Sequence, residues 1–174
     1  MKIFLFALAV LGAAALNSIA QTTSTSSSPK TGGGKFSIGL DGGLPVGEIS
    51  NGFNAVVGGS LKYEFPTATS TYFTISGGYS AFLTKAILKN LGAKSSVGFV
   101  PLKAGIKGYV SDGVFLEGQL GVVFSTEDNG GHAFVYSPGV GYTFSSGFEA
   151  GVRYEGWYNN GTVSQIALRL AYRL

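Results

Sequence analysis

The feature that most constrains this sequence is an alternation of apolar and polar residues with a period of two. It recurs in eight segments, at residues 35–42, 53–65, 71–82, 97–110, 114–125, 133–144, 148–158 and 163–174. Successive side chains of a β-strand point to opposite faces, so a period of two indicates strands that have one apolar and one polar face. The pattern predicts an all-β chain of eight strands and leaves no room for a long helix.

The connections between these segments alternate in length. Short turns follow the second, fourth and sixth segments, at 66–70, 111–113 and 145–147. Longer loops follow the first, third and fifth, at 43–52, 83–96 and 126–132, and the last connection is the short stretch 159–162. Short turns at one end and longer loops at the other are typical of an antiparallel up-and-down barrel that crosses an outer membrane.

The aromatic residues indicate which face of the strands is turned outward. They gather at both ends of the apolar face, with aliphatic residues between them. Two aromatic bands around an aliphatic waist fit the two interfaces of a bilayer, whereas a soluble core gives no reason for such sorting. The predicted girdle residues are Tyr63, Phe65, Phe73, Tyr142, Phe144, Phe148 and Tyr172 at the short-turn end, and Tyr79, Phe124, Phe134, Tyr136, Tyr154 and Tyr158 at the loop end. Phe53 is expected on the same face at the loop end.

The charged residues of the strands lie on the opposite face from these rings. Six basic and five acidic side chains share it, which is nearly balanced. An Arg or Lys facing lipid at mid-membrane costs about 2–4 kcal/mol, so the charged face is expected inside, where small residues leave space for an ion-pair network. The predicted network comprises Asp41, Lys62, Glu64, Lys103, Lys107, Glu117, Glu149, Arg153, Glu155, Arg169 and Arg173. The alternative is a soluble secreted β-barrel, with the apolar face turned inward around an apolar ligand.

The N-terminal segment reads as a secretory signal followed by a tail. An apolar run from Ile3 to Leu16 is too short to span a membrane and is followed by small residues, which predicts a signal peptide over 1–20. Residues 21–34 are rich in Ser, Thr and Gly and are expected to form a flexible periplasmic tail before the barrel at 35–174. The net charge of +3 is too weak to indicate nucleic-acid binding, and the absence of Cys excludes disulfides.

With these features, the chain resembles the small eight-stranded outer-membrane barrels of the OmpX/OmpA type. Its last segment is similar to the family's C-terminal assembly signal, with Ile166, Leu168, Leu170 and Tyr172 on one face, although Leu174 stands where the family has an aromatic residue. The resemblance implies residence in the outer membrane and insertion by the barrel-assembly machinery. We expect a monomer in contact with lipopolysaccharide, with both termini periplasmic because an even number of strands returns the chain to the short-turn end. It implies no single activity, because fold does not fix function.

We expect no catalysis, cofactor or metal. The expected function is an envelope-structural or surface-interaction role, such as adhesion. A third reading is a lipid-modifying enzyme that uses His132, the sole histidine, which is expected in a loop near Ser125.

Residues 83–96 form the most distinctive loop, where Leu83, Ile87, Leu88 and Leu91 recur near helical spacing among lysines, so it is a candidate for contact with lipid or a surface partner. Pro138 falls inside the sixth segment, where a bulge or a later strand start is expected because Pro cannot donate to a ladder.

Overall fold

The computed structural model describes residues 33–127, 130–159 and 161–174 of the 174-residue chain. The eight strands are β1 (Lys35–Val46), β2 (Phe53–Ala68), β3 (Thr71–Thr84), β4 (Ser96–Tyr109), β5 (Val114–Ser125), β6 (His132–Thr143), β7 (Phe148–Tyr158) and β8 (Thr162–Arg173). A 3-10 turn η1 (Gly47–Asn51) and a short helix α2 (Ala86–Asn90) lie between strands. Within the described ranges, neither helix is long and apolar enough to cross a membrane. The predicted signal peptide and residues 21–32 of the predicted tail lie outside the described residues.

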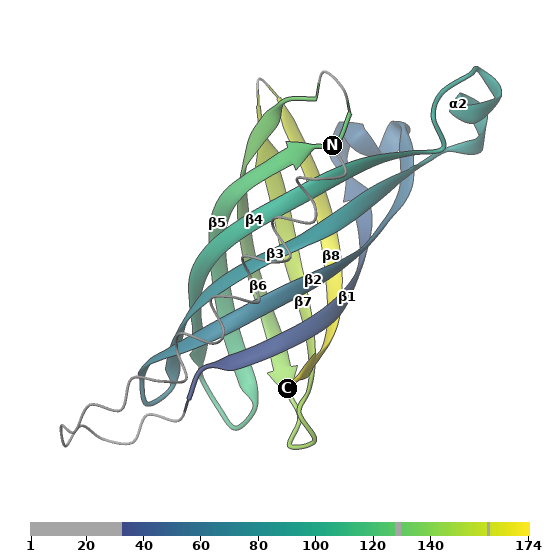
Figure 1. Cartoon of the computed structure of the whole chain (residues 1–174). Coiled ribbons are helices and arrows are strands. Elements are labelled where there is room, and N and C mark those ends of the chain that lie inside the picture. Colours follow the sequence, from purple (N-terminus) through teal and green to yellow (C-terminus); the bar gives the residue numbers. More distant parts are fainter. Residues whose placement is uncertain (1–32, 128–129, 160) are drawn as a thin grey trace. The chain divides into compact units, whose positions relative to one another are not determined.

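The strands form one closed antiparallel barrel in which every strand pairs with its neighbours in sequence (Figure 1). Closure joins β1 to β8 from Ser37 opposite Arg173 to Val46 opposite Ser164. At the edge of this seam the Leu174 amide donates to the Phe36 carbonyl, with an N···O distance of 2.9 Å. The predicted fold class is confirmed, because alternation on every strand gives the closed sheet one continuous inner and one continuous outer face.

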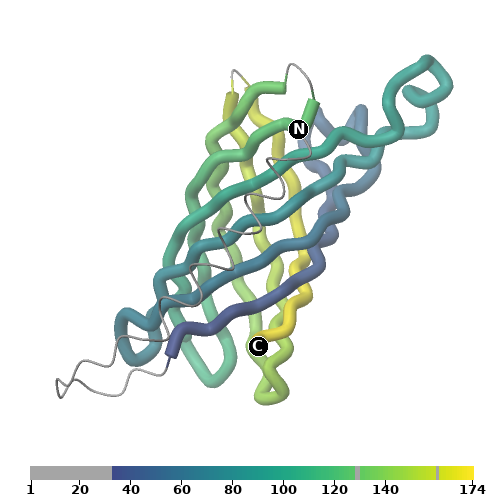
Figure 2. Tube along the Cα trace, in the orientation of Figure 1, coloured from purple at the N-terminus to yellow at the C-terminus, as the bar shows by residue number. Residues whose placement is uncertain are grey.

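The two ends of the barrel differ as the connection lengths predict. β1 begins and β8 ends at one end, which also holds the three tight turns β2–β3, β4–β5 and β6–β7 (Figures 1 and 2). Gly113 and Gly147 take positive φ angles, of 79° and 88°, in two of these turns, a conformation that favours glycine. The opposite end holds η1, α2 and the other connections, and we call it the loop end.

Several strands are longer than the sequence pattern indicates. β1 continues through Gly43–Val46, which were expected in a loop, and pairs there with Ala167, Ile166, Gln165 and Ser164 of β8. The expected loop 83–96 is shortened to 85–95, because Leu83 and Thr84 belong to β3 and Ser96 to β4. His132, expected in a loop, is the first residue of β6 and lies opposite Phe124. In each case ladder pairing to the adjacent strand extends past the point where the alternation weakens.

The prediction that Pro138 causes a bulge or a later strand start was wrong. β6 pairs with β5 without a register shift from His132 to Tyr142, including Pro138 opposite Gly118. On the β7 side, ladder pairs stop at Tyr136–Gly156 and resume in the same register at Gly139–Arg153. Because proline lacks an amide hydrogen, one side of β6 carries a short gap in the ladder while the other side remains paired. Pro101 produces the same kind of gap between β3 and β4.

The barrel is inverted relative to a soluble protein. Leu40 is 74 % exposed and Ile106 62 % exposed on the outside, whereas Lys107 inside is 0 % exposed. A water-soluble barrel places these groups the other way round, because burying an ammonium is costly and burying leucine is favourable. The alternative of a soluble barrel with an apolar interior therefore does not fit the structure.

A β-bulge reverses the expected side of one aromatic residue. Pairing of β2 with β3 slips between Phe53 and Ala55, which places Phe53 inside the barrel. Its ring packs edge-on against Phe82, with 5.5 Å between the ring centroids. The expectation of Phe53 on the lipid face was wrong, because one extra residue in a strand exchanges the two faces beyond it.

Candidate functional site: the barrel lumen

The charged side chains of the inner face meet in the lumen in two clusters. The first surrounds Lys62 and Lys107. Lys62 Nζ lies 2.9 Å from Glu149 Oε1, 3.2 Å from Glu117 Oε2 and 3.3 Å from Glu64 Oε1. Lys107 Nζ lies 2.8 Å from Glu64 Oε1 and also contacts Glu149 Oε2. These five residues come from β2, β4, β5 and β7, of which only β4 and β5 share a ladder, so the cluster also ties together strands that are not paired with one another.

Two arginines of β8 complete the first cluster. Arg173 Nη2 lies 2.8 Å from Glu64 Oε2, and Arg169 Nη1 lies 3.3 Å from Glu149 Oε1. Both carboxylates are almost fully buried, and each faces more than one cation. Buried charges are tolerated when they are paired and hydrogen-bonded in this way.

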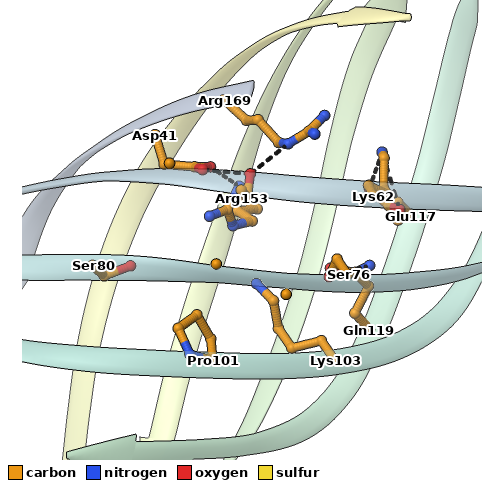
Figure 3. A pocket seen from close by; sticks show the side chains of 14 residues that line it. Asp41, Lys62, Ser76, Ser80, Pro101, Lys103, Glu117, Gln119, Arg153 and Arg169 are labelled. Carbon is orange, nitrogen blue, oxygen red and sulfur yellow. Dashed lines mark hydrogen bonds and ion pairs between the residues drawn. The ribbon is translucent and has the colours of Figure 1, made fainter. Parts of the chain in front are cut away.

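The second cluster lies nearer the loop end, around Arg153 and Glu155. Arg153 bridges Asp41 and Glu155, with N···O distances of 2.8 Å to each, and Lys103 Nζ lies 2.8 Å from Glu155 Oε2. Ser60 joins the two clusters, because its Oγ donates to Asp41 Oδ2 and accepts from Arg169 Nε at 3.0 Å. Figure 3 shows Asp41, Arg153 and Arg169 converging beside β2. Every residue of the predicted network thus lies inside the barrel in at least one ion pair.

An aromatic ring on the inner face supports the first cluster. Phe115 is 3 % exposed, and the Nζ atoms of Lys62 and Lys107 lie 5.7 and 3.9 Å from its ring centroid. A cation above an aromatic face is attracted by the ring quadrupole, most strongly where water is excluded. Phe115 was not singled out from the sequence, although it shares the inner face of β5 with Glu117 and Gln119.

Glycines on the inner face make room for the long charged side chains. A Cβ atom on Gly39 would lie 2.9 Å from the Arg169 guanidinium, and one on Gly139 would lie 2.9 Å from Arg153 Cβ. On Gly105 a Cβ would meet the Gly118 carbonyl and would lie 2.7 Å from Gln119 Cα. These positions tolerate no side chain without movement of the barrel wall or of the network.

Between the charged groups the lumen is nearly full. The cavity that the two clusters border has a volume of about 30 Å³, which leaves room for very few water molecules. An interior just filled by side chains is the expected geometry of eight strands. The carboxylates that border this cavity are held by cations, with little free space beside them.

The loop-end part of the lumen is apolar, which the sequence analysis missed. Phe82, Val123, Val135 and Trp157 are at most 4 % exposed and form one cluster with Val56. The centroids of the Phe82 and Trp157 rings are 5.1 Å apart, and Trp157 Nε1 donates to Glu155 Oε1 at 3.0 Å. This hydrogen bond connects the apolar layer to the charged one. The residues share the inward register of the charged side chains, and that register is the signal from which they could have been found.

The predicted girdle residues lie on the outer face, most of them toward the ends of the strands, whereas Tyr136 and Tyr154 lie near the middle of β6 and β7. Three are partly covered by neighbouring side chains, namely Tyr63, Phe65 and Tyr136. Tyr136 lies over Gly156, where an added Cβ would meet its ring. The other members are exposed, namely Phe73, Tyr79, Phe124, Phe134, Tyr142, Phe144, Phe148, Tyr154, Tyr158 and Tyr172.

His132, the candidate for lipid-modifying chemistry, lies on the rim of the loop end. Its ring centroid is 6.3 Å from that of Phe124, and its carbonyl accepts a hydrogen bond from Asn159 Nδ2 at 2.8 Å. No carboxylate is paired with its imidazole in residues 33–127, 130–159 and 161–174. Within the same ranges, no three His, Asp or Glu side chains gather in a way that could hold a metal ion.

The connection between β3 and β4 is a short helical loop with little cover. Only residues 86–90 are helical, and none of them is buried. Ile87 is 68 % and Leu91 79 % exposed, beside Lys85 and Lys89. The loop is tied to the barrel by the Lys85 amide, which donates to the Gly52 carbonyl at 3.0 Å, and by an ion pair between Lys94 and Glu127. An amphipathic helix from Leu83 is thus reduced to about one turn.

Solved structures show which known proteins share this architecture. Ail, the attachment invasion locus protein of Yersinia pestis, superposes with a TM-score of 0.57 at 17 % identity, over 81 % of this chain and 97 % of Ail. The chain has the fold of a small eight-stranded outer-membrane β-barrel. The N-terminal barrel of Pseudomonas aeruginosa OprF superposes with a TM-score of 0.56 at 14 % identity, over 80 % and 97 % of the two chains.

The same barrel fold carries different activities among these proteins. The outer-membrane enzyme PagL superposes with a TM-score of 0.52 at 14 % identity, over 78 % of this chain and 98 % of PagL. No protein-family model and no curated protein sequence matches the chain. The fold is therefore established by the structure, and the role of this barrel has to be argued from its own residues.

Proposed function

We propose that this protein is an integral, non-catalytic outer-membrane barrel that acts in the envelope through its exposed loop end. The observation that carries the proposal is the combination of an apolar outer face with a lumen in which the described charged side chains are held in ion pairs. Lipid is the environment in which that distribution is stable. The barrel serves as an anchor, because the nearly full charged layer of the lumen gives no wide channel through the barrel.

The fold supports this location. Ail and PagL are both described as outer-membrane proteins, and each superposes over nearly its whole length. Location is tested by separating the membrane and soluble fractions of expressing cells and by comparing unboiled with boiled protein in SDS gels. A heat-dependent mobility shift of protein from the membrane fraction is expected. A soluble protein without such a shift contradicts the proposal.

The loop-end surface supports a role in interaction rather than transport. Three lysines, Lys85, Lys89 and Lys94, accompany the exposed Ile87 and Leu91 in the β3–β4 connection. A cationic segment with exposed apolar residues binds anionic amphiphiles through charge attraction and apolar burial. The proposed partner is therefore an anionic lipid or saccharide surface such as lipopolysaccharide. Ail, which is named for attachment, has the same fold.

The interaction is tested with variants of the loop alone. Replacing Lys85, Lys89 and Lys94 together by Gln removes the charge, and replacing Ile87 and Leu91 by Ser removes the apolar contact. Lys35→Gln is a control at the opposite end of the barrel. Binding to lipopolysaccharide vesicles is expected to fall in both loop variants and not in the control, with the gel shift intact in all. Equal binding by all proteins contradicts the surface role and leaves the membrane location standing.

A non-catalytic barrel predicts no change in lipid A when the protein is expressed. His132 has no acidic partner among the described residues, and the lumen carboxylates are held in ion pairs. Lipid A from cells that carry the protein, its His132→Ala variant or no protein is compared by mass spectrometry. Identical species are expected, and a species that requires His132 would establish the enzyme instead.

A further inference from the structure

Two cavities lie inside the loop end, next to the apolar layer of the lumen. One has a volume of about 130 Å³ and is bordered by Phe53, Phe82 and Val163 among other residues. The other has a volume of about 150 Å³ and is bordered by Val123, and also by the polar side chains of Ser125 and His132. Both share a wall that includes Ala133 and the rings of Phe99 and Trp157. The space is separate from the small polar cavity between the ion-pair clusters.

The walls of the first cavity exclude charged ligands. Its described lining is aliphatic and aromatic apart from the amide of Asn159 at the rim. The one polar atom of the Trp157 ring is already occupied, because Nε1 donates to Glu155 Oε1 at 3.0 Å. A charged ligand would lose its hydration here and find no counter-ion, which is strongly unfavourable. An uncharged molecule with at most one hydrogen-bonding group fits this chemistry.

The arrangement of rings favours an aromatic occupant. The Phe99 and Trp157 rings are 5.0 Å apart at 66°, and the Phe82 and Phe99 rings are 5.3 Å apart at 75°. Such edge-to-face geometry extends naturally to another ring, because the edge of one ring attracts the face of the next. The apolar first cavity, of about 130 Å³, is close in size to the apolar cavity of about 150 Å³ that is known to bind benzene in another protein.

From these observations we propose that the loop-end lumen is a binding site for a small, uncharged aromatic molecule. The ring of the ligand packs against the cluster formed by Trp157, Phe99 and Phe82, and Asn159 receives a polar substituent where one is present. The site contains no residue of the loop 85–95, so an experiment on the site does not test the proposed surface role.

Trp157 makes the site directly observable. It is the only tryptophan of the chain, so the intrinsic fluorescence of the protein reports on this wall of the cavity alone. Folded protein in detergent micelles is titrated with bromobenzene, whose heavy atom quenches tryptophan on contact. Saturable quenching that toluene reverses is expected, because toluene competes for the same space.

Variants that fill the cavities distinguish binding of the probe at this site from its partition into the detergent micelle. Ala133→Leu places a larger side chain in the wall that both cavities share, and Val163→Phe fills the first cavity independently. Ala104→Leu is the matched control, because Ala104 is exposed on the outer face of β4. The half-saturating concentration of bromobenzene is expected to rise about tenfold or more in the two filling variants and to stay unchanged in the control. The gel-mobility shift is recorded for each protein, so a misfolded variant is set aside and the other decides.

Two results would overturn the proposal. Quenching that rises linearly and equally in all folded proteins would show partition into the micelle only. Saturable quenching that the filling variants leave unchanged would place the probe elsewhere on the barrel. A fluorine NMR titration of fluorobenzene gives a second readout, in which line broadening is expected for the wild type and Ala104→Leu and is lost in Ala133→Leu.

Discussion

Lys107 lies with its ammonium 3.9 Å from the centre of the Phe115 ring and 2.8 Å from the Glu64 carboxylate, and it is inaccessible to solvent. This lysine is therefore held between a ring and two carboxylates, since Glu149 is its other partner. Other charged side chains of the inner face are held in similar contacts, and the effect of removing such contacts on stability can be measured.

Removing that ammonium is expected to destabilise the barrel strongly. In Lys107→Met the carboxylates of Glu64 and Glu149 lose a close cation in a buried setting, which costs about 3–5 kcal/mol for a broken buried pair. The free energy of unfolding is measured by urea titration in lipid vesicles. Lys94→Met is the control, because the Lys94–Glu127 pair is exposed and exposed pairs contribute about 0–1 kcal/mol. Equal losses in the two variants would contradict the network.

Adding one methyl group to the inner wall is expected to be far more harmful than adding it outside. In Gly105→Ala the new Cβ meets the Gly118 carbonyl and the Gln119 backbone, so two strands must separate, which costs about 1–3 kcal/mol. Gly118→Ala is the matched control, since nothing lies within 4 Å of its Cβ position. The temperature at which the folded gel band disappears is expected to fall in Gly105→Ala only.

A charge on the aliphatic waist distinguishes lipid from water around the barrel. Leu168 is 45 % exposed and pairs with Gly42 and Val152. Leu168→Arg is expected to lower the free energy of unfolding in vesicles by about 2–4 kcal/mol, because the arginine faces hydrocarbon. In Leu91→Arg, where the side chain is 79 % exposed in the loop of residues 85–95, no comparable loss is expected. A tolerated Leu168→Arg would argue against insertion.

The connection between the two layers of the lumen is tested at Trp157. Trp157→Phe keeps a ring in the apolar layer and deletes the hydrogen bond to Glu155, which is expected to cost about 1.5–3 kcal/mol because the acceptor is charged. Tyr158→Phe, next in sequence and 60 % exposed on the outer face, is the control and is expected to be near neutral. Urea unfolding followed by circular dichroism compares them, and a neutral Trp157→Phe would show that the bond contributes nothing.

The fold could be predicted because its main determinant is local. Alternation along each segment shows which residues share a face, and the connection lengths show which ends of the strands meet. The number of strands and their antiparallel order follow from these two patterns. Partner identities do not, because Lys62 and Glu149 are separated by 87 positions and meet only through the stagger of the closed sheet. The sequence therefore shows which residues face the lumen. Which of them form ion pairs with one another depends on the three-dimensional closure of the barrel.

Two predictions from the sequence were wrong because they depend on how a strand pairs with its neighbours. Phe53 changes face because of one bulge, and no residue type in that stretch marks it. Pro138 stays in a continuous strand because only its β7 side lacks pairs, whereas the sequence shows only that a donor is missing. The apolar layer was missed for a different reason. The charged residues identified the inner face of the strands. Phe82 and Trp157 lie on that same face near the loop end, but they are uncharged and were not assigned to the lumen.

The seam between β1 and β8 closes the barrel by joining the first described strand to the last. A sheet that holds the other seven seams still has two open edges, whose amides and carbonyls have no partners in hydrocarbon and can pair with another copy. Those edges disappear together when β8 pairs with β1, and this pairing joins strands from the two ends of the described chain. The reverse step must expose both edges at once. The finished barrel is therefore protected by a kinetic barrier as well as by its equilibrium stability.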